Sequence, residues 1–440
     1  MASGNAGKKR RIKKAKLARF IFCICSLIFF LFCTIFYGCR LIKYYKIYNP
    51  KSENGESVDL LATKVTKDAS VVYEGDGLYR VNGVYLFKGD VTNNYVYYSN
   101  MLWRIVKIGT DNTVELVLDE PINNLMWNKT ITDYTNSDVH KYLNDVFLKT
   151  LNQDLLVQST ICTDLVTDIA KITCTNTYKE SYVKLLSVTD YLNTKVKKTF
   201  VNPENDSLWL SDRNKTKAWY VAGSNISSYS PEESYLIKPV VTLKMQTTAM
   251  GGKGTKDDPY VIEKTSKNIK PGSYVKLGTD TYIAYEVGKD TVKLILNGLY
   301  KEGNFTYRFD RTNSTFSTTK SGSLGNYLNT TLYNSLSYKD LLVETDWYTG
   351  SYKTSYKNIY ENKVKAKIGL YNVTDLKYGL TSTESYLLTP GSTNTVYTLG
   401  KKMTTTKVTS TEAIRPAVAI KTPKIKSGDG TSKSPYELEA

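Results

Sequence analysis

The chain has 440 residues, with 59 Lys+Arg against 42 Asp+Glu and a single His. That length suits two to three domains that each bury a core of their own. One histidine argues against Ser-His-Asp hydrolases, multi-histidine zinc sites and 2-His-1-carboxylate iron sites. Much of the net charge of +17 comes from the first residues of the chain, so we expect no nucleic-acid partner.

The first predicted element is a membrane anchor. Residues 1–19 carry only basic charges, and Phe20–Cys39 carries no charged side chain. A helix of this length spans about 30 Å, the thickness of the hydrocarbon core. The cation excess before it predicts a single-pass signal anchor in the cell membrane, with a cytoplasmic tail (1–19) and extracellular C-terminal domains. A lipoprotein signal with Cys39 acylated is an alternative interpretation.

Beyond the anchor, residues 40–70 lack sustained periodicity and are predicted to form a stalk. The rest of the chain contains the same landmarks twice, in the same order. The matched pairs are Trp103–Asp119 with Tyr282–Gly298, Lys141–Asn144 with Asn326–Asn329, Val188–Asp190 with Val373–Asp375, Ser207–Ser211 with Ser385–Thr389, Ile237–Lys244 with Ile414–Lys421, and Gly252–Glu263 with Gly428–Glu439. We therefore predict a duplication: a first domain at 71–263, a linker at 264–272 and a second domain at 273–440.

Each copy is predicted to be α+β: mainly antiparallel strands with one or two helices. Apolar residues alternate in Val114–Leu118 and again in Val292–Leu296, which predicts strands, and Gly109–Asn112 is predicted to be a hairpin turn. Apolar residues at helical spacing follow Ser137 and Ser323, which are predicted helix caps.

Two cysteines, Cys162 and Cys174, lie in the part placed outside the cell. A pair in an oxidising compartment predicts one disulfide, which closes a short loop. Two thiols without a nearby histidine make a poor zinc site, so we expect no metal.

The first copy carries the features of a known family. Those features are Leu78–Ile108, Cys162-Thr163-Asp164 with Cys174, Trp209, Lys238–Lys244, and the G-x-G-T-x3-P-Y segment Gly252–Tyr260. Together they resemble tyrosine-rich repeated surface domains of low-GC Gram-positive bacteria, a family without an assigned function. The second copy matches more loosely and lacks the cysteines. More distantly, the order of a tryptophan strand and an Arg-Pro strand resembles the formylglycine-generating and C-type-lectin-like folds, which implies a fold without that chemistry.

Several motifs have structural interpretations that we favour over catalytic ones. The two G-x-G-T-x3-P-Y segments are predicted to be tight turns, because glycine supplies positive φ there. Asp190 and Asp375 occupy matched places and are predicted to cap helices or turns. His140 is predicted to face solvent. We expect no catalytic residue and no cofactor.

Tyrosine is the main indication of function. The chain has 36 Tyr, some of them clustered. Tyrosine gives rigid amphipathic contact area, which suits recognition of glycans or proteins, although strands and buried helix stripes also accept it. The predicted binding residues are Tyr95, Tyr97, Tyr98, Trp347, Tyr348 and Tyr352.

The sequence therefore predicts a membrane-anchored surface protein with a non-catalytic recognition role, for a glycan, an envelope polymer or a partner protein. An enzyme that processes envelope polysaccharide, and a structural component of the envelope or of its assembly, are the alternatives. The sequence makes no prediction about oligomeric state.

Overall fold

The computed structural model describes residues 21–22, 24–38, 40, 58–174, 178–263, 268–400 and 402–439. It divides the chain into two compact units, Met1–Leu60 and Leu61–Ala440. The predicted cytoplasmic tail and most of the predicted stalk lie outside the described residues, as does the core of the predicted linker.

In the first unit, residues 21–22, 24–38 and 40 are helical. Large apolar side chains on this helix are exposed, among them Phe22 at 73% and Leu27 at 69%. Phe20, Cys23 and Cys39 of the predicted anchor are not among the described residues. A search of the described residues found no helix with both the length and the hydropathy to cross a bilayer.

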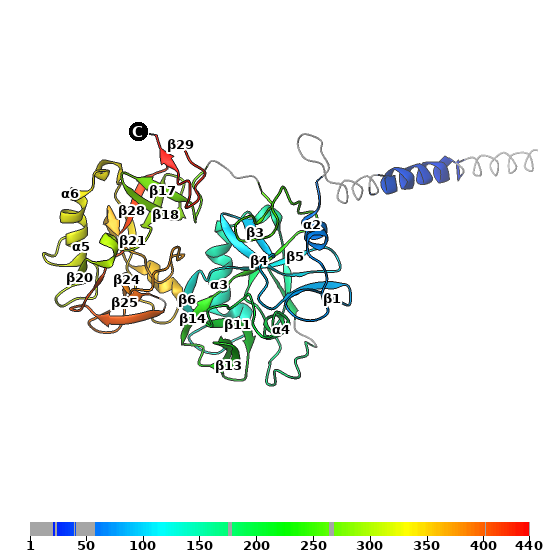
Figure 1. Ribbon diagram of the computed structural model, residues 1–440, viewed down its shortest axis with the longest axis horizontal. Helices are drawn as coiled ribbons and strands as arrows, with labels where there is room; N and C mark the ends of the chain where they lie inside the picture. Colours follow the sequence, from blue (N-terminus) through cyan, green and yellow to red (C-terminus); the bar gives the residue numbers. More distant parts are fainter. Residues whose placement is uncertain are drawn as a thin grey trace, which may run out of the picture. The chain divides into compact units, whose positions relative to one another are not determined.

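The second unit is mainly antiparallel β with few helices (Figure 1). Its α-helices are α2 (Leu61–Asp68), α3 (Asp138–Asp145), α4 (Val188–Asn193), α5 (Leu324–Tyr327) and α6 (Tyr333–Ser335), and a π-helical turn, η5 (Leu328–Leu332), joins the last two. The 3-10 turns are η1 (Tyr134–Asn136), η2 (Phe147–Thr150), η3 (Gln153–Leu155), η4 (Tyr300–Gly303), η6 (Lys339–Leu341) and η7 (Tyr356–Glu361).

The strands before the linker are β1 (Gly77–Val81), β2 (Val84–Lys88), β3 (Tyr95–Tyr98), β4 (Met101–Ile108), β5 (Val114–Leu118), β6 (Asn123–Met126), β7 (Leu156–Val157), β8 (Ser159–Cys162), β9 (Tyr178–Ser181), β10 (Val183–Lys184), β11 (Ser207–Arg213), β12 (Ala218–Ala222), β13 (Asn225–Tyr229), β14 (Ser234–Ile237), β15 (Val240–Leu243) and β16 (Tyr260–Val261). The strands after it are β17 (Tyr274–Leu277), β18 (Asp280–Val287), β19 (Thr291–Leu296), β20 (Thr306–Arg308), β21 (Thr345–Tyr348), β22 (Lys363–Ala366), β23 (Ile368–Gly369), β24 (Ser385–Pro390), β25 (Thr395–Leu399), β26 (Met403–Lys407), β27 (Thr411–Ala413), β28 (Ala417–Lys421), β29 (Ile425–Ser427) and β30 (Glu437–Leu438).

The strand order is the same before and after the linker. We call residues 71–263 the first half and residues 273–439 the second half. The order β4-β5-β15-β10 in the first half corresponds to β18-β19-β28-β23 in the second. A second sheet runs β13-β12-β11-β14-β6 in the first half and β26-β25-β24-β27-β20 in the second. In each of these second sheets the same step is parallel, β11 to β14 and β24 to β27.

The local sequence explains these elements. The predicted alternating rows form β5 and β19, and both are interior strands that pair on two sides, β5 with β4 and β15 and β19 with β18 and β28. Ser137 and Ser323 are N-caps, as predicted, because their hydroxyls accept from His140 N and Asn326 N, both at 3.2 Å.

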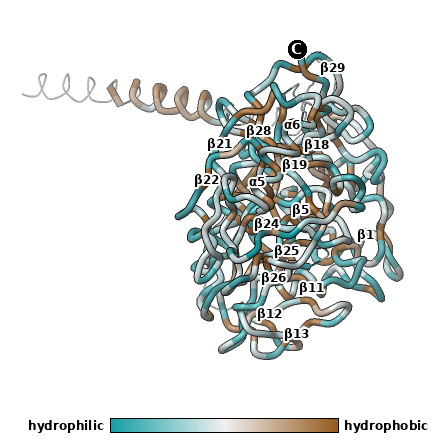
Figure 2. The backbone as a smooth tube through the Cα atoms, turned by 90° about the vertical axis from the view of Figure 1, so that its left-hand side faces the viewer, coloured by the Kyte–Doolittle hydropathy of each residue, from teal (hydrophilic) through white to brown (hydrophobic). Residues whose placement is uncertain are grey.

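Hydrophobic residues gather on the central strands, as Figure 2 shows around β19 and β28. Four tryptophan side chains, Trp103, Trp127, Trp209 and Trp347, are fully buried among them. These rings and the neighbouring aliphatic residues make up the core on which each half is built.

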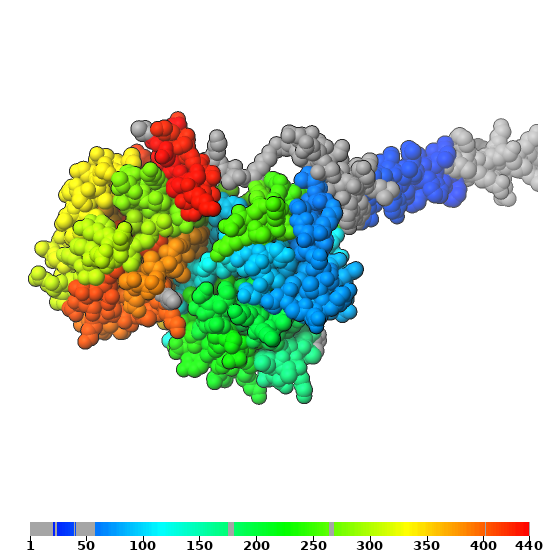
Figure 3. Space-filling view, viewed as in Figure 1, coloured from blue at the N-terminus to red at the C-terminus, as the bar shows by residue number. Residues whose placement is uncertain are grey.

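The predicted stalk, residues 40–70, includes a helix that packs on the first half. Residues 61–68 form α2, whose Leu61, Ala62 and Val65 are buried. The helix is tied to the first half by Leu61 N, which donates to Thr247 O at 2.8 Å, and by Tyr260, whose hydroxyl donates to Asp68 at 3.1 Å. Figure 3 shows this blue helix beside the green segment that leads to Tyr260. The three buried residues of α2 form too short a pattern for the helix to be recognised from the sequence.

The two G-x-G-T-x3-P-Y segments are turns with matching geometry. Gly252 and Gly428 both have φ of +88°, and a Cβ on either would lie within 2.2 Å of a proline carbonyl oxygen. The turns hold the matched strands β3 and β17: Tyr95 N donates to Gly254 O, and Tyr274 N donates to Gly430 O, both at 2.8 Å. The glycines are therefore required by close backbone approach as well as by φ.

Two further predictions concern single side chains. The predicted disulfide is present between Cys162 and Cys174, whose Cα atoms lie 5.9 Å apart. The prediction for His140 is wrong, because the ring is half-buried. It packs edge-on against Tyr134 at 5.0 Å and its Nε2 lies 3.0 Å from Ser181 Oγ.

Candidate functional site

Three of the predicted binding residues lie on β3. Tyr95 is buried, with the Arg104 guanidinium 3.9 Å from its ring centroid. Tyr98 is fully buried and donates its hydroxyl proton to Asn152 O at 2.7 Å. Tyr97 is half-buried, and burial raises its pKa to about 12. Tyr95 and Tyr98 thus pack inside the first half and offer little surface to a ligand.

The other three predicted residues lie in the second half. Trp347 is buried and donates from Nε1 to Ala366 O at 2.9 Å. Tyr352 is also buried, and its hydroxyl accepts from Met126 N at 2.9 Å. Tyr348 is half-buried and lines a cleft. The structure therefore does not bring the six predicted residues together, and Tyr348 alone among them reaches this cleft.

This cleft has a volume of about 950 Å³ and is open to solvent. It is lined by residues of both halves and of the segment between them: Ser99, Asp145, Val146, Lys149, Thr150, Leu151, Asn152, Ile269, Lys270, Pro271, Tyr285, Glu286, Val287, Tyr348, Tyr356, Lys357, Tyr360, Thr374, Asp375 and Leu376. A cleft of this size with aromatic walls and a few polar groups is the usual form of a binding site. We call it the central cleft.

Hydrogen bonds between the halves set the position of its walls. Asn123 of β6 donates from Nδ2 to Val373 O at 2.9 Å, and the Tyr142 hydroxyl of α3 donates to Thr374 O at 2.8 Å. The Lys377 amide donates to Ile122 O at 3.0 Å. The loop that carries Asp375 is thus fixed against the first half, where water does not compete for these bonds.

The aromatic wall comes from β21 and η7. The rings of Tyr348 and Tyr360 meet edge to face with centroids 5.0 Å apart. Tyr356 donates its hydroxyl proton to Asp145 Oδ2 at 2.8 Å, which links η7 to the end of α3. Tyr360 is 40% exposed, so part of its ring is open to solvent.

Asp145, Glu286 and Asp375 are the carboxylates that line the cleft. Asp375 forms a reciprocal cap with Asn372: its Oδ2 accepts from Asn372 N at 2.7 Å, and Asn372 Oδ1 accepts from Asp375 N at 3.0 Å. Burial raises the pKa of Asp375 to about 6, against the lowering effect of Lys377 and Lys293, and Glu286 adds to the rise. The predicted capping role is confirmed, and the raised pKa was not foreseen.

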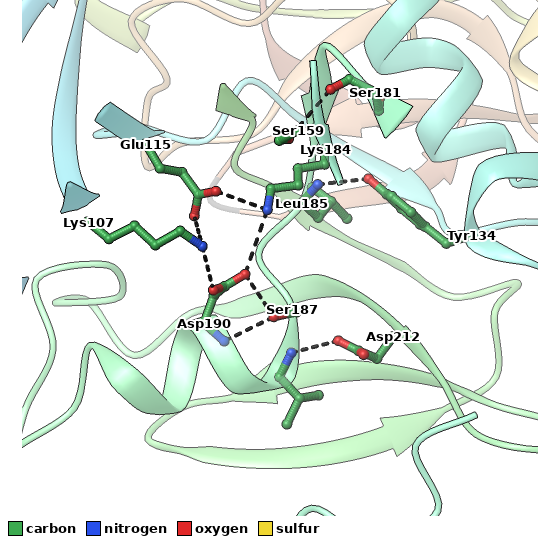
Figure 4. A network of polar contacts seen from close by, with 11 residues as sticks. Lys107, Glu115, Tyr134, Ser159, Ser181, Lys184, Leu185, Ser187, Asp190 and Asp212 are labelled. Carbon is green, nitrogen blue, oxygen red and sulfur yellow. Dashed lines mark hydrogen bonds and ion pairs between the residues drawn. The ribbon is translucent and has the colours of Figure 1, made fainter. Parts of the chain in front are cut away.

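The matched position in the first half shows the opposite electrostatics (Figure 4). Ser187 caps α4, because its Oγ accepts from Asp190 N at 3.0 Å, and Asp190 supports this cap by accepting from the Ser187 hydroxyl at Oδ2, at 2.8 Å. Lys107 Nζ lies 3.1 Å from Asp190 Oδ1 and Lys184 Nζ lies 3.7 Å from Oδ2. Burial alone raises the pKa of Asp190, but Lys184 and Lys107 outweigh it and hold the pKa well below its usual value.

Glu115 completes this network. Its carboxylate lies 3.2 Å from Lys107 Nζ and 3.0 Å from Lys184 Nζ, and its side chain is 3% exposed. The two lysines and two acids compensate each other in the interior, which is the arrangement that makes buried charges tolerable. We interpret this network as structural.

The second half reverses the charges of the central pair. Lys107 and Glu115 face each other across β4 and β5, and Glu286 and Lys293 occupy the matched places across β18 and β19. Lys293 Nζ lies 3.0 Å from Glu286 Oε2. Gly369 stands where Lys184 does, and a Cβ there would lie 2.3 Å from the Trp347 ring.

Tyr285 is the remaining polar group of interest. It lines the cleft and is 4% exposed, yet its buried hydroxyl has no hydrogen-bond partner among the described residues. Burial raises its pKa well above the usual value, so the group stays a neutral donor. An orphaned buried hydroxyl is costly unless something binds it.

Sequence reasoning missed Tyr285, Glu286 and Tyr360. The charge reversal was visible in the matched landmarks, since Lys107 aligns with Glu286 and Glu115 with Lys293. Nothing in the sequence indicated that these residues share a cleft with Asp145 of α3, because that proximity arises from contacts between the halves.

The described residues offer one group with metal-ligand geometry, Cys162, Asp164 and Cys174. Both sulfur atoms are committed to the disulfide, so this group lacks the thiolates that zinc requires. Comparisons of the chain with protein-family models, with curated proteins and with solved structures found no match.

Proposed function

We propose that this protein is a membrane-anchored surface protein with a non-catalytic recognition role, and that the central cleft receives its ligand. The ligand classes are a glycan, an envelope polymer or a partner protein. In this proposal the basic N-terminus lies in the cytoplasm, and the two halves are tandem copies of one domain outside the cell.

The cleft is the observation that carries this proposal. It combines the open ring of Tyr360 with the rings of Tyr348 and Tyr285 in one space of about 950 Å³. Aromatic rings supply contact area at low entropic cost, and the polar side chains among the lining residues supply specificity.

The membrane location has separate support. The helical residues 24–38 present apolar side chains to the outside, including Phe30 and Phe32, both 68% exposed. An exposed apolar surface of this kind is stable in contact with lipid or another apolar surface and not in water. The disulfide agrees with an oxidising compartment.

Binding of the full-length protein in detergent to a glycan array and to envelope extract tests the proposal. We expect Tyr348→Ala and Tyr360→Ala each to weaken binding about tenfold, because each removes an aromatic wall of the cleft. Tyr73→Ala is the matched control, since Tyr73 is 92% exposed and does not line the cleft. Equal binding by all three variants would contradict the proposal.

An enzyme acting on envelope polysaccharide is the second candidate, and one observation favours it. Asp375 and Glu286 line the same cleft, and Asp375 has a pKa of about 6, as a general acid requires. If the protein is this enzyme, Asp375→Asn abolishes turnover of envelope polysaccharide while ligand binding persists. If it is a recognition protein, no turnover is detected before or after the substitution.

A further inference from the structure

One edge of β18 lies open in the central cleft. We propose that residues Tyr285–Val287 of this edge take up an extended polypeptide strand of a partner protein, with a basic side chain placed beside Glu286 and Asp375. This proposal rests on the recognition function proposed above and names its ligand class. The matched edge in the first half belongs to β4, and strands of the chain itself occupy that edge.

In the first half, the strand matched to β18 is paired along this side near both of its ends. β3 covers the start of β4, with Tyr95 opposite Arg104. The hairpin β1–β2 then covers the end of β4, with Leu86 opposite Lys107 and Tyr85 opposite Ile108 (Figure 1). The edge is closed by the chain itself.

In the second half, the cover stops halfway. β17 pairs with β18 as far as Ile283, and Ser273 continues the pairing to Ala284. Beyond that point, no strand among the described residues pairs with this side of Tyr285–Val287, and the second half has no counterpart of the β1–β2 hairpin. The other side of the strand pairs with β19.

The uncovered edge faces the central cleft. Tyr285, Glu286 and Val287 all line it, the side chain of Glu286 is 50% exposed, and Val287 is 37% exposed. An open strand edge in a concave, apolar setting is a template for another strand. Recognition by strand addition obtains its affinity from such main-chain hydrogen bonds.

The charges of Glu286 and Asp375 indicate which side chain the incoming strand carries. In the first half, Lys107 stands on this edge and lies 3.1 Å from Asp190. In the second half the same place is Glu286, so the strand edge itself supplies no cation to Asp375. The nearby cations have other partners: Lys293 lies 3.0 Å from Glu286 Oε2, and the Lys377 ammonium donates to the carbonyls of Asn372, Val373 and Asp375. A lysine or arginine on the incoming strand restores the ion pair that the duplication lost.

Peptides test this proposal directly. The probe is a peptide with the sequence of β2, Val84–Lys88, in which Leu86 is replaced by lysine, because Leu86 is the residue opposite Lys107 in the first half. Binding to the full-length protein in detergent is measured by fluorescence anisotropy. We expect saturable binding, and we expect hydrogen exchange of the Tyr285–Val287 amides to slow when the peptide is present.

Charge reversal is the first control. Glu286→Lys places lysine where the first half has Lys107. We expect this variant to bind the peptide with lysine at the Leu86 position about tenfold more weakly. We expect it to bind a peptide with glutamate at that position more tightly, since the interaction follows the sign of the charge. That gain also shows that the variant is folded. Backbone N-methylation on the edge-facing residues of the peptide abolishes binding, whereas methylation on the opposite residues leaves it unchanged.

The outcomes separate this proposal from the recognition function. Glycan binding that depends on Tyr348, without peptide binding, overturns strand addition and keeps the recognition function. If neither glycan binding nor peptide binding is detected, both strand addition and the recognition function are overturned. Dimerisation of the full chain that Glu286→Lys abolishes, without peptide binding, makes the occupant a second copy and also overturns the proposal.

Discussion

Two aspartates at matched positions show how residue environment decides chemistry. Asp190 lies between Lys107 and Lys184, whereas Asp375 lines a cleft beside Glu286. The former is held ionised, and the latter takes up a proton near pH 6. The Asp190 carboxylate accepts from the Ser187 hydroxyl and the Asp375 carboxylate accepts from Asn372 N, so both support a local cap or turn, and the surrounding charges set their pKa values apart.

This difference predicts opposite effects of the same substitution. Asp190→Asn is expected to lower the free energy of unfolding by about 3 kcal/mol at pH 7, because it leaves Lys107 and Lys184 with Glu115 as their one remaining partner in this network. Asp375→Asn is expected to raise it by about 1 kcal/mol at pH 8, because it removes a desolvated charge. Urea unfolding of the full-length protein in detergent measures both.

The pH dependence follows from the direction of each shift. The pKa of Asp375 is raised in the folded state to about 6, so the penalty of its charge appears as pH rises through 6 and is absent below about 4. The gain from Asp375→Asn should therefore vanish at acidic pH. The pKa of Asp190 is lowered, so its contribution is present at neutral pH and is lost only below about pH 4. A gain from Asp375→Asn that is equal at pH 4 and pH 8 would contradict this assignment.

At the scale of elements, the glycine turns position the matched strands β3 and β17. Gly252 has φ of +88°, and its Cβ position lies 1.9 Å from Pro259 O. Its neighbour Gly251 has open space around the same position. The turn therefore tolerates a side chain at one glycine and not at the next.

Gly252→Ala is accordingly expected to destabilise the protein by about 3 kcal/mol, because the backbone must move to relieve the clash and the strained φ. Gly251→Ala is expected to stay within about 0.5 kcal/mol of wild type. Differential scanning calorimetry of the two variants measures the contrast. Equal transition temperatures for both would show that the turn does not constrain β3.

At the scale of the whole second unit, the interface between the halves builds the cleft. The Tyr142 hydroxyl donates to Thr374 O at 2.8 Å across this interface, and the side chain is fully buried. Burial raises the pKa of Tyr142 well above its usual value, so the hydroxyl stays a protonated donor at neutral pH.

Tyr142→Phe is expected to leave each half folded and to weaken the coupling between them by about 1.5 kcal/mol, because Thr374 O loses a buried donor. Calorimetry should then show a broadened or split transition where wild type unfolds in one step. Ligand affinity at the central cleft should fall as well. Tyr134→Phe, which removes a hydroxyl bonded to Leu185 N within the first half, is the matched control and should lower stability without splitting the transition.

The sequence by itself determined the features that depend on nearby residues. The alternating rows of β5 and β19, the caps at Ser137 and Ser323, the glycine turns and the disulfide were all predictable, because periodicity, capping and turn chemistry act over a few residues. The helix α2 was missed because three apolar residues give too weak a pattern.

Only the tertiary structure decided which tyrosines are accessible, how Asp190 and Asp375 differ, and where the cleft and the open edge of β18 lie. Tyr98 and Tyr348 have the same local character, yet one is fully buried and the other lines the cleft. Burial and charge compensation arise from contacts between residues far apart in the chain, such as Asn123 with Val373. Local pattern carries no information about such distances, so these properties were decided when the two halves packed together.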